Sequence, residues 1–138
     1  ISFGSKIGML TVSLYLFEGI FGLPVFSGTP EKGVGLIYFT GPTMGYLIGF
    51  LIAAYLAGSF QYKDIFKDNI LKFFINYIKL LLAVSSIYIL GLLWLGNIIG
   101  WDKPVFQFGA QPFLLAESLK ILILSIIAGK MSKLRKII

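Results

Sequence analysis

The chain has 138 residues, of which 57% are hydrophobic and 13% charged, with a net charge of +6 and a mean hydropathy of +0.90. A soluble domain is about half apolar and about a quarter charged, so this composition excludes a soluble globule and indicates a membrane protein. The sequence has no cysteine and no histidine, which excludes disulfides, thiolate or imidazole metal sites and any catalytic pair that needs either residue. We therefore expect no metal ion and no cofactor.

Four apolar runs follow one another along the chain. A membrane-crossing helix needs roughly 20 largely apolar residues, and the five prolines lie between these runs or at their ends, where they do not break a helix. The sequence predicts an all-α membrane protein with one membrane domain, residues 1–138, and four transmembrane helices. Their expected spans are residues 7–26, 45–60, 74–95 and 113–129. The apolar pattern allows the third helix to begin as early as Asn69.

Lysine and arginine residues gather in two places, the connection 60–72 and the tail 130–136. Cytoplasmic flanks of membrane helices collect these residues, so we expect a multi-pass protein of the plasma membrane with both termini cytoplasmic. The same rule explains the net positive charge, which therefore does not indicate a nucleic-acid partner. The basic tail is placed to contact anionic lipid of the bilayer.

The other two connections, residues 27–43 and 97–111, are unusually apolar and aromatic for exposed loops. Irregular backbone at membrane depth is tolerated where protein or a cavity covers it. We expect both segments to fold back over the outer end of the bundle and to line a pocket there. The alternative is that they lie in the headgroup layer, anchored by their aromatic side chains.

Glu117 and Lys120 lie inside the fourth apolar run. Residues three apart share a helix face, so both charges are expected to point the same way. A charge that faces lipid is costly, and such residues normally face a bundle interior or a cavity. Two interpretations stay open: a self-satisfied pair that pins helices together, or a ligand site in which the pair meets a polar solute.

Four segments resemble one family specifically and in order along the chain. They are YLFEGIFGLPVFSG, FTGPTMGYLIGFLIAAYLAG, IYILGLLWL and GAQPFLLAESLKI, at residues 15–28, 39–58, 87–95 and 109–121. Together they look like the BioY family, the biotin-binding substrate subunits of energy-coupling-factor vitamin transporters. Members have six membrane helices, so the resemblance implies that this chain carries helices three to six and lacks the first two. It also implies a membrane-embedded coupling subunit and ATPase subunits as partners.

The resemblance also implies site residues. The family segment Pro-Phe-Leu-Pro-Gly-Asp-x-x-Lys is matched here with Glu117 in place of Asp, and with Leu115 and Ala116 in place of Pro-Gly, so the last helix is expected to begin one turn early. In the family, the residue directly before the Gly-Pro-Thr segment contributes a polar contact to the ligand, and in this sequence that residue is Thr40. The expected biotin-binding residues are Glu117, Lys120, Tyr46, Thr40, Thr43 and Phe113.

The chemistry of these residues suits biotin. A carboxylate can accept hydrogen bonds from the ureido N–H groups, an ammonium can meet a ligand oxygen, and Tyr46 offers a wall for the fused rings. The sequence has no Gly-x-x-x-x-Gly-Lys-Ser/Thr motif, so the chain is not expected to hydrolyse ATP, and energy for uphill import is expected from another subunit or from an ion gradient. The resemblance implies the first of these, a separate ATPase module.

Two other functions stay open at this point. One is a binding subunit or permease for another vitamin or small organic acid on the same scaffold. The other is an intramembrane enzyme that uses Glu117 as a general acid or base. A single carboxylate without a nucleophile, histidine or metal partner makes a poor catalytic site, so we do not expect an enzyme.

Overall fold

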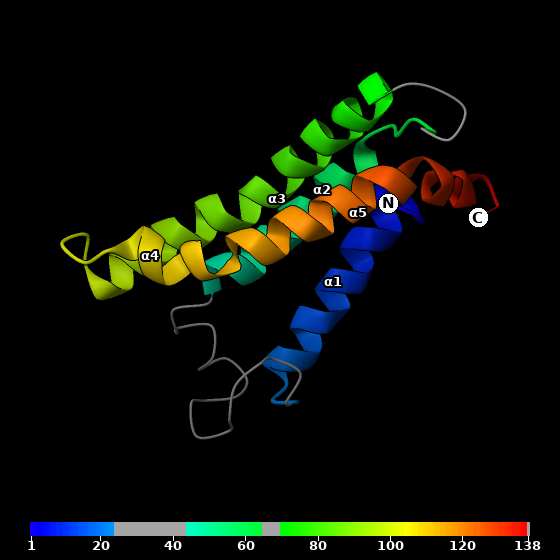
Figure 1. Ribbon diagram of the computed structural model, residues 1–138. Coiled ribbons are helices and arrows are strands. Elements are labelled where there is room, and N and C mark those ends of the chain that lie inside the picture. Colours follow the sequence, from blue (N-terminus) through cyan, green and yellow to red (C-terminus); the bar gives the residue numbers. More distant parts are fainter. Residues whose placement is uncertain (24–43, 65–69, 138) are drawn as a thin grey trace.

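The computed structural model describes residues 1–23, 44–64 and 70–137. All regular structure in these residues is helical, which confirms the predicted all-α class (Figure 1). The elements are α1 (Gly4–Ile20), α2 (Met44–Ser59), α3 (Ile70–Ile99), α4 (Val105–Gly109), α5 (Leu114–Ser132) and two 3-10 turns, η4 (Gln111–Phe113) and η5 (Lys133–Lys136).

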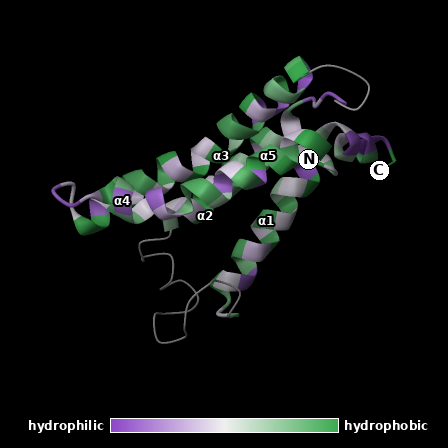
Figure 2. Ribbon diagram, in the orientation of Figure 1, coloured by the Kyte–Doolittle hydropathy of each residue, from purple (hydrophilic) through white to green (hydrophobic). Residues whose placement is uncertain are grey.

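The helices pack in the order α1, α2, α3, α5, with α2 between α1 and α3 and with α3 against α5 (Figure 1). Both ends of the described chain lie at the same end of the bundle, near the last turns of α5. We call this the tail end, and we call the opposite end, where α4 lies, the α4 end. Figure 2 shows hydrophilic residues gathered toward these two ends, in the turn before α4 and in the tail.

Two helical segments among the described residues, Ile70–Ile99 and Val105–Lys136, are long and apolar enough to cross a membrane, and α2 is a shorter apolar helix. Helices overlap all four expected spans, but their ends differ from the expected ones. Helix α3 is the longest, and its 30 residues correspond to about 45 Å. Crossing of the membrane by four helices stays a prediction.

Helix α1 ends at Ile20, whereas the expected span continued to residue 26. The reason is Gly22, which has a φ of +90° and lies directly after the last turn. The Gly22 N–H donates to the Gly19 carbonyl at 3.1 Å, and the Leu23 N–H donates to the Glu18 carbonyl at 3.2 Å. This pair of bonds is a Schellman motif, in which a left-handed glycine satisfies the last carbonyls and stops the helix.

Helices α2 and α3 approach closely because small residues face each other where they cross. A Cβ at Gly45 would overlap the Leu90 carbonyl oxygen, and a Cβ at Gly49 would lie 2.6 Å from the Ile87 Cα. Both glycines are buried. Small residues four apart allow two membrane helices to bring their backbones together, and the contact is then made by van der Waals packing along the whole crossing.

The segment 97–111 is not the irregular loop that its composition suggested. Helix α3 continues to Ile99, and a turn with Gly100 at φ +97° leads into α4. Val105, Gly109 and Ala110 are buried, and α4 packs back on α3. The segment therefore packs against α3 as a short helix and not as an irregular loop. Its expected place over the outer end of the bundle, where it would line a pocket, stays a prediction.

A buried asparagine joins three parts of the chain at the tail end. The Asn76 amide donates to the Lys63 carbonyl at 2.8 Å and to the Ser125 carbonyl at 3.2 Å, and its oxygen accepts from the Lys63 N–H at 2.9 Å. Asn76 is fully buried. The amide thereby fixes the connection after α2 against both α3 and α5.

Arg135 fixes the end of α2 in the same region. Its guanidinium donates to the carbonyls of Phe60 at 2.9 Å and Ala57 at 3.4 Å, and it lies over the Tyr62 ring. Burial raises the pKa of Tyr62 to about 12, opposed by the positive charge of Arg135. The Tyr62 hydroxyl therefore stays protonated and donates to the Ala57 carbonyl at 2.7 Å. A cation at a helix C-terminus also interacts favourably with the helix dipole.

We predict that Asn76→Ala destabilises the protein by about 1–3 kcal/mol, because it removes the buried hydrogen bond to the Ser125 carbonyl and the two part-buried bonds to the Lys63 backbone. Thermal unfolding in detergent, followed by tryptophan fluorescence, measures the change. The matched control is Asn97→Ala, the same substitution at an exposed position near the end of α3. Equal melting temperatures for the two variants would contradict the assigned role of Asn76.

Candidate functional site

The first turns of α5 carry the charged pair that the sequence singled out. Helix α5 begins at Leu114, so Leu115 and Ala116 are helical and Glu117 lies in the first turn. This start agrees with the prediction that loss of Pro-Gly lets the helix begin early. The Lys120 Nζ lies 3.4 Å from the Glu117 Oε1. The two charges therefore contact each other on one helix face, as the three-residue spacing predicted.

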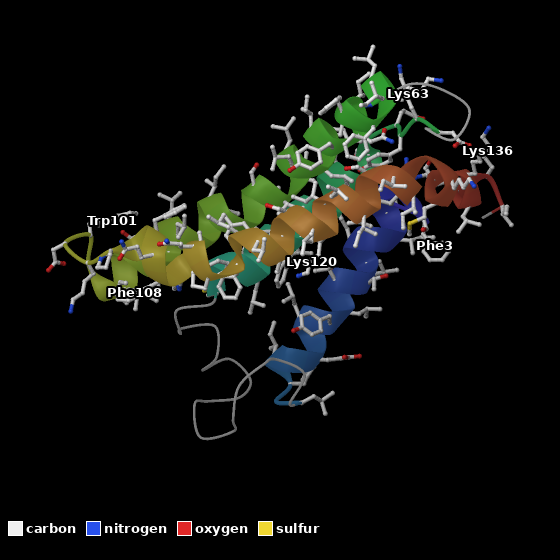
Figure 3. All side chains as sticks on the ribbon, viewed as in Figure 1. Phe3, Lys63, Trp101, Phe108, Lys120 and Lys136 are labelled. Atoms are coloured by element: carbon white, nitrogen blue, oxygen red, sulfur yellow. The ribbon has the colours of Figure 1, made fainter. Side chains whose placement is uncertain are left out.

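The two charged side chains are not buried alike. The side chain of Glu117 is 23% exposed and that of Lys120 is 66% exposed. We expected both charged side chains to face the bundle interior or a cavity, but in the part of the chain that the structure describes Lys120 is exposed. Figure 3 shows Lys120 on the side of α5 that faces away from α3, and this position accounts for the exposure of its ammonium.

Tyr88 on α3 is a site residue that the sequence analysis missed. It is half-buried, and it forms a side-chain hydrogen bond with Glu117. A carboxylate is an acceptor, so the tyrosine hydroxyl is the donor in this bond. The signal in the sequence was a tyrosine within the apolar run IYILGLLWL, whose hydroxyl needs a partner when the ring is buried. The sequence did not show which helix supplies that partner.

Tyr46 on α2 braces the site. Its hydroxyl donates to the Gly109 carbonyl at 2.7 Å, and its ring meets the Tyr88 ring edge to face, with centroids 6.1 Å apart. A Cβ at Gly91 would overlap the Tyr46 ring, and a Cβ at Gly109 would overlap its hydroxyl. The two glycines thus form a socket for this side chain. Tyr46 ties α2, α3 and α4 together, and its predicted contact with a ligand stays a prediction.

The remaining expected site residues are less informative. Phe113 lies in η4, directly before α5, and is 51% exposed. Thr40 and Thr43 lie outside the described residues, as does the first of the two segments expected to line a pocket. The pocket itself therefore stays a prediction.

The arrangement at the α4 end is suited to hydrogen bonding with a small polar ligand. It presents a carboxylate as acceptor and an ammonium as donor, next to two aromatic rings. Charged groups make the strong hydrogen bonds of such sites, while apolar and aromatic walls bury the rest of a ligand. No group of three or more potential metal ligands occurs in the part of the chain that the structure describes.

Comparison with known proteins gives a consistent result. The BioY family profile matches residues 1–137. The chain is 32% identical over 128 residues to a probable biotin transporter BioY of Pyrococcus horikoshii, and the match covers 93% of this chain and 70% of that protein. It is 30% identical over 131 residues to the biotin transporter BioY of Thermotoga maritima, and this match covers 95% of this chain and 72% of that protein.

A third relative, a probable biotin transporter BioY of Rickettsia prowazekii, is 26% identical over 98% of this chain and 65% of its own length. The fold is similar to the crystal structure of the S-component for biotin from an ECF-type ABC transporter, with a TM-score of 0.69 and 25% identity. That match covers 98% of this chain and 68% of the solved one. The chain thus spans about two thirds of the length of these proteins.

We predict that Gly91→Ala destabilises the protein, because the new methyl group displaces the Tyr46 ring from its socket. The control is Gly8→Ala in α1, where the nearest atom to the new Cβ is the Ala54 carbonyl oxygen at 3.7 Å. That substitution should stabilise by roughly 0.5–1 kcal/mol, because alanine loses less backbone entropy in a helix than glycine. Melting temperatures that shift in opposite directions would support the socket, and a stabilised Gly91→Ala would contradict it.

Proposed function

The chain belongs to the BioY family, and from this membership we propose that it is the biotin-binding substrate subunit of an energy-coupling-factor transporter. The observation that carries the proposal is the family match over residues 1–137, joined by the similarity to a solved biotin S-component. Members of this family are transport proteins and not enzymes, so an intramembrane enzyme is excluded.

In the proposed site, Glu117 accepts hydrogen bonds from the ureido N–H groups of biotin. Lys120, whose ammonium is exposed, donates to a ligand oxygen. Tyr46 and Phe113 face the apolar rings, and Thr40 and Thr43 add polar contacts, as the resemblance implies. Charge-assisted bonds of this kind are about twice as strong as neutral ones, and they explain why a membrane helix retains two charged residues.

The proposed energy source is a separate module. The sequence lacks a phosphate-binding loop for ATP, and the solved relative is a component of an ABC transporter. We therefore propose a membrane-embedded coupling subunit and ATPase subunits as partners, with this chain as the part that captures biotin at the outer face.

The proposed topology places the tail end in the cytoplasm of the cell and the α4 end outside, with four crossings of the plasma membrane. Lys63, Lys133 and Arg135 lie together at the tail end, which supports this orientation because cytoplasmic flanks collect basic residues.

Single cysteines test the topology directly, because the sequence has no native cysteine. We predict that Lys136→Cys in the tail reacts with a membrane-impermeant maleimide only after the cells are opened. Asp102→Cys in the turn before α4 should react in intact cells. Both positions are exposed, so a reversed pattern would contradict the orientation and the outer location of the site.

Ligand binding to the purified intact protein tests the function. We predict that biotin binds, and that lipoate, which has a similar acid tail but no ureido group, binds far more weakly, as do thiamine and riboflavin. Isothermal titration calorimetry measures all four ligands. Tight binding of another vitamin with none for biotin would refute the assignment and favour the alternative, a different substrate on the same scaffold.

The same titration tests the role of Glu117. Glu117→Gln keeps the size of the side chain but removes its charge, so biotin affinity should fall about tenfold or more, since bonds to charged groups contribute about 1.5–3 kcal/mol. The matched control is Glu18→Gln, at an exposed carboxylate on α1, which should leave the affinity unchanged. A Glu117→Gln variant that folds and binds biotin normally would show that the pair is structural.

A further inference from the structure

Tyr88 lies at the α4 end but is not one of the expected site residues, so its hydroxyl has no role in the proposed site so far. Tyr88 lies on α3, between Tyr46 of α2 and Glu117 of α5, and contacts both. It reaches Glu117 from another helix, whereas Lys120 contacts the carboxylate from within α5 itself.

Tyr88 is the less exposed of the two side chains that contact the carboxylate. The Lys120 side chain is 66% exposed and its Nζ lies 3.4 Å from the Glu117 Oε1. Exposed ion pairs hold long side chains only weakly, because screening and lost side-chain entropy offset the attraction. Tyr88 is half-buried and has only two side-chain torsions, so its hydroxyl is held in place by the packing of its ring.

The position of Tyr88 is fixed in turn by Tyr46. The two rings meet edge to face at an angle of 87°, an arrangement that aromatic pairs favour. Tyr46 cannot turn away easily, since its hydroxyl is bonded to the Gly109 carbonyl at 2.7 Å and its ring lies against Gly91. A continuous series of contacts therefore runs from α4 through α2 and α3 to the carboxylate on α5.

We propose that Tyr88 is a positioning residue for ligand recognition, whose hydroxyl holds the Glu117 carboxylate in the orientation that receives the ureido N–H groups of biotin. A carboxylate has about four acceptor positions. Tyr88 and Lys120 occupy two of them and leave the others for the two N–H groups of the ring. This inference rests on the proposed function, because it assigns the ligand's contact to Glu117.

The test is a double-mutant cycle on the intact protein, with biotin affinity measured by calorimetry for the wild type, Tyr88→Phe, Glu117→Gln and the variant with both. Tyr88→Phe keeps the ring and its contact with Tyr46. We expect it to weaken binding about tenfold in the wild-type background and to have no further effect when Glu117→Gln is present, because residues that act through one another are not additive. Tyr55→Phe, at an exposed tyrosine of α2, is the matched control and should bind normally.

The outcomes separate the two hypotheses. If the wild-type protein does not bind biotin, or if Glu117→Gln binds it normally, the proposed site is wrong and this inference falls with it. A weakened Glu117→Gln together with a normal Tyr88→Phe, or with equal losses in both backgrounds, overturns the positioning role alone. Tyr88→Met, which also lacks the hydroxyl, should reproduce the loss. If neither Tyr88 variant yields folded protein, the residue is structural and the inference is wrong.

Discussion

The close crossing of α2 and α3 is the contact on which the rest of the α4 end depends. Gly45 and Gly49 bring the backbones together, and this places Tyr46 against α3 at the level of Gly91 and Tyr88. From there its hydroxyl reaches α4. In lipid there is no hydrophobic force between helices, so tight packing of small residues has to supply the association. Larger residues at these positions would separate the aromatic rings that brace the site.

Local geometry explains what could be predicted about the charged pair. The contact between Glu117 and Lys120 follows from a spacing of three on one helix, which the sequence states directly. The hydrogen bond from Tyr88 depends on how α3 lies against α5, and a single sequence contains no measure of that. The exposure of Lys120 was missed for the same reason, since burial depends on which neighbouring helix covers a given face.

The positions of the helices could also be predicted from the sequence, whereas the residues at which they end could not. Apolar runs predicted that helices exist in four regions, but their boundaries depended on single glycines. Gly22 stops α1 and Gly100 ends α3 through left-handed conformations, whereas other described glycines, such as Gly45 and Gly91, lie inside helices. Composition also could not distinguish an irregular apolar loop from the short helix α4, because both can contain the same residues and an irregular loop is tolerated at membrane depth where protein covers it.

The Arg135 contacts have a consequence for the order in which the molecule is completed. Arg135 follows Phe60 by 75 residues, and at synthesis rates of about 5–20 residues per second these residues take about 4–15 s to make. During that interval the last carbonyls of α2 must be satisfied by water or lipid headgroups. The C-terminal end of α2 therefore stays without its side-chain partner until the basic tail has been translated. Only then can Arg135 bond the carbonyls there and complete the packing at the tail end.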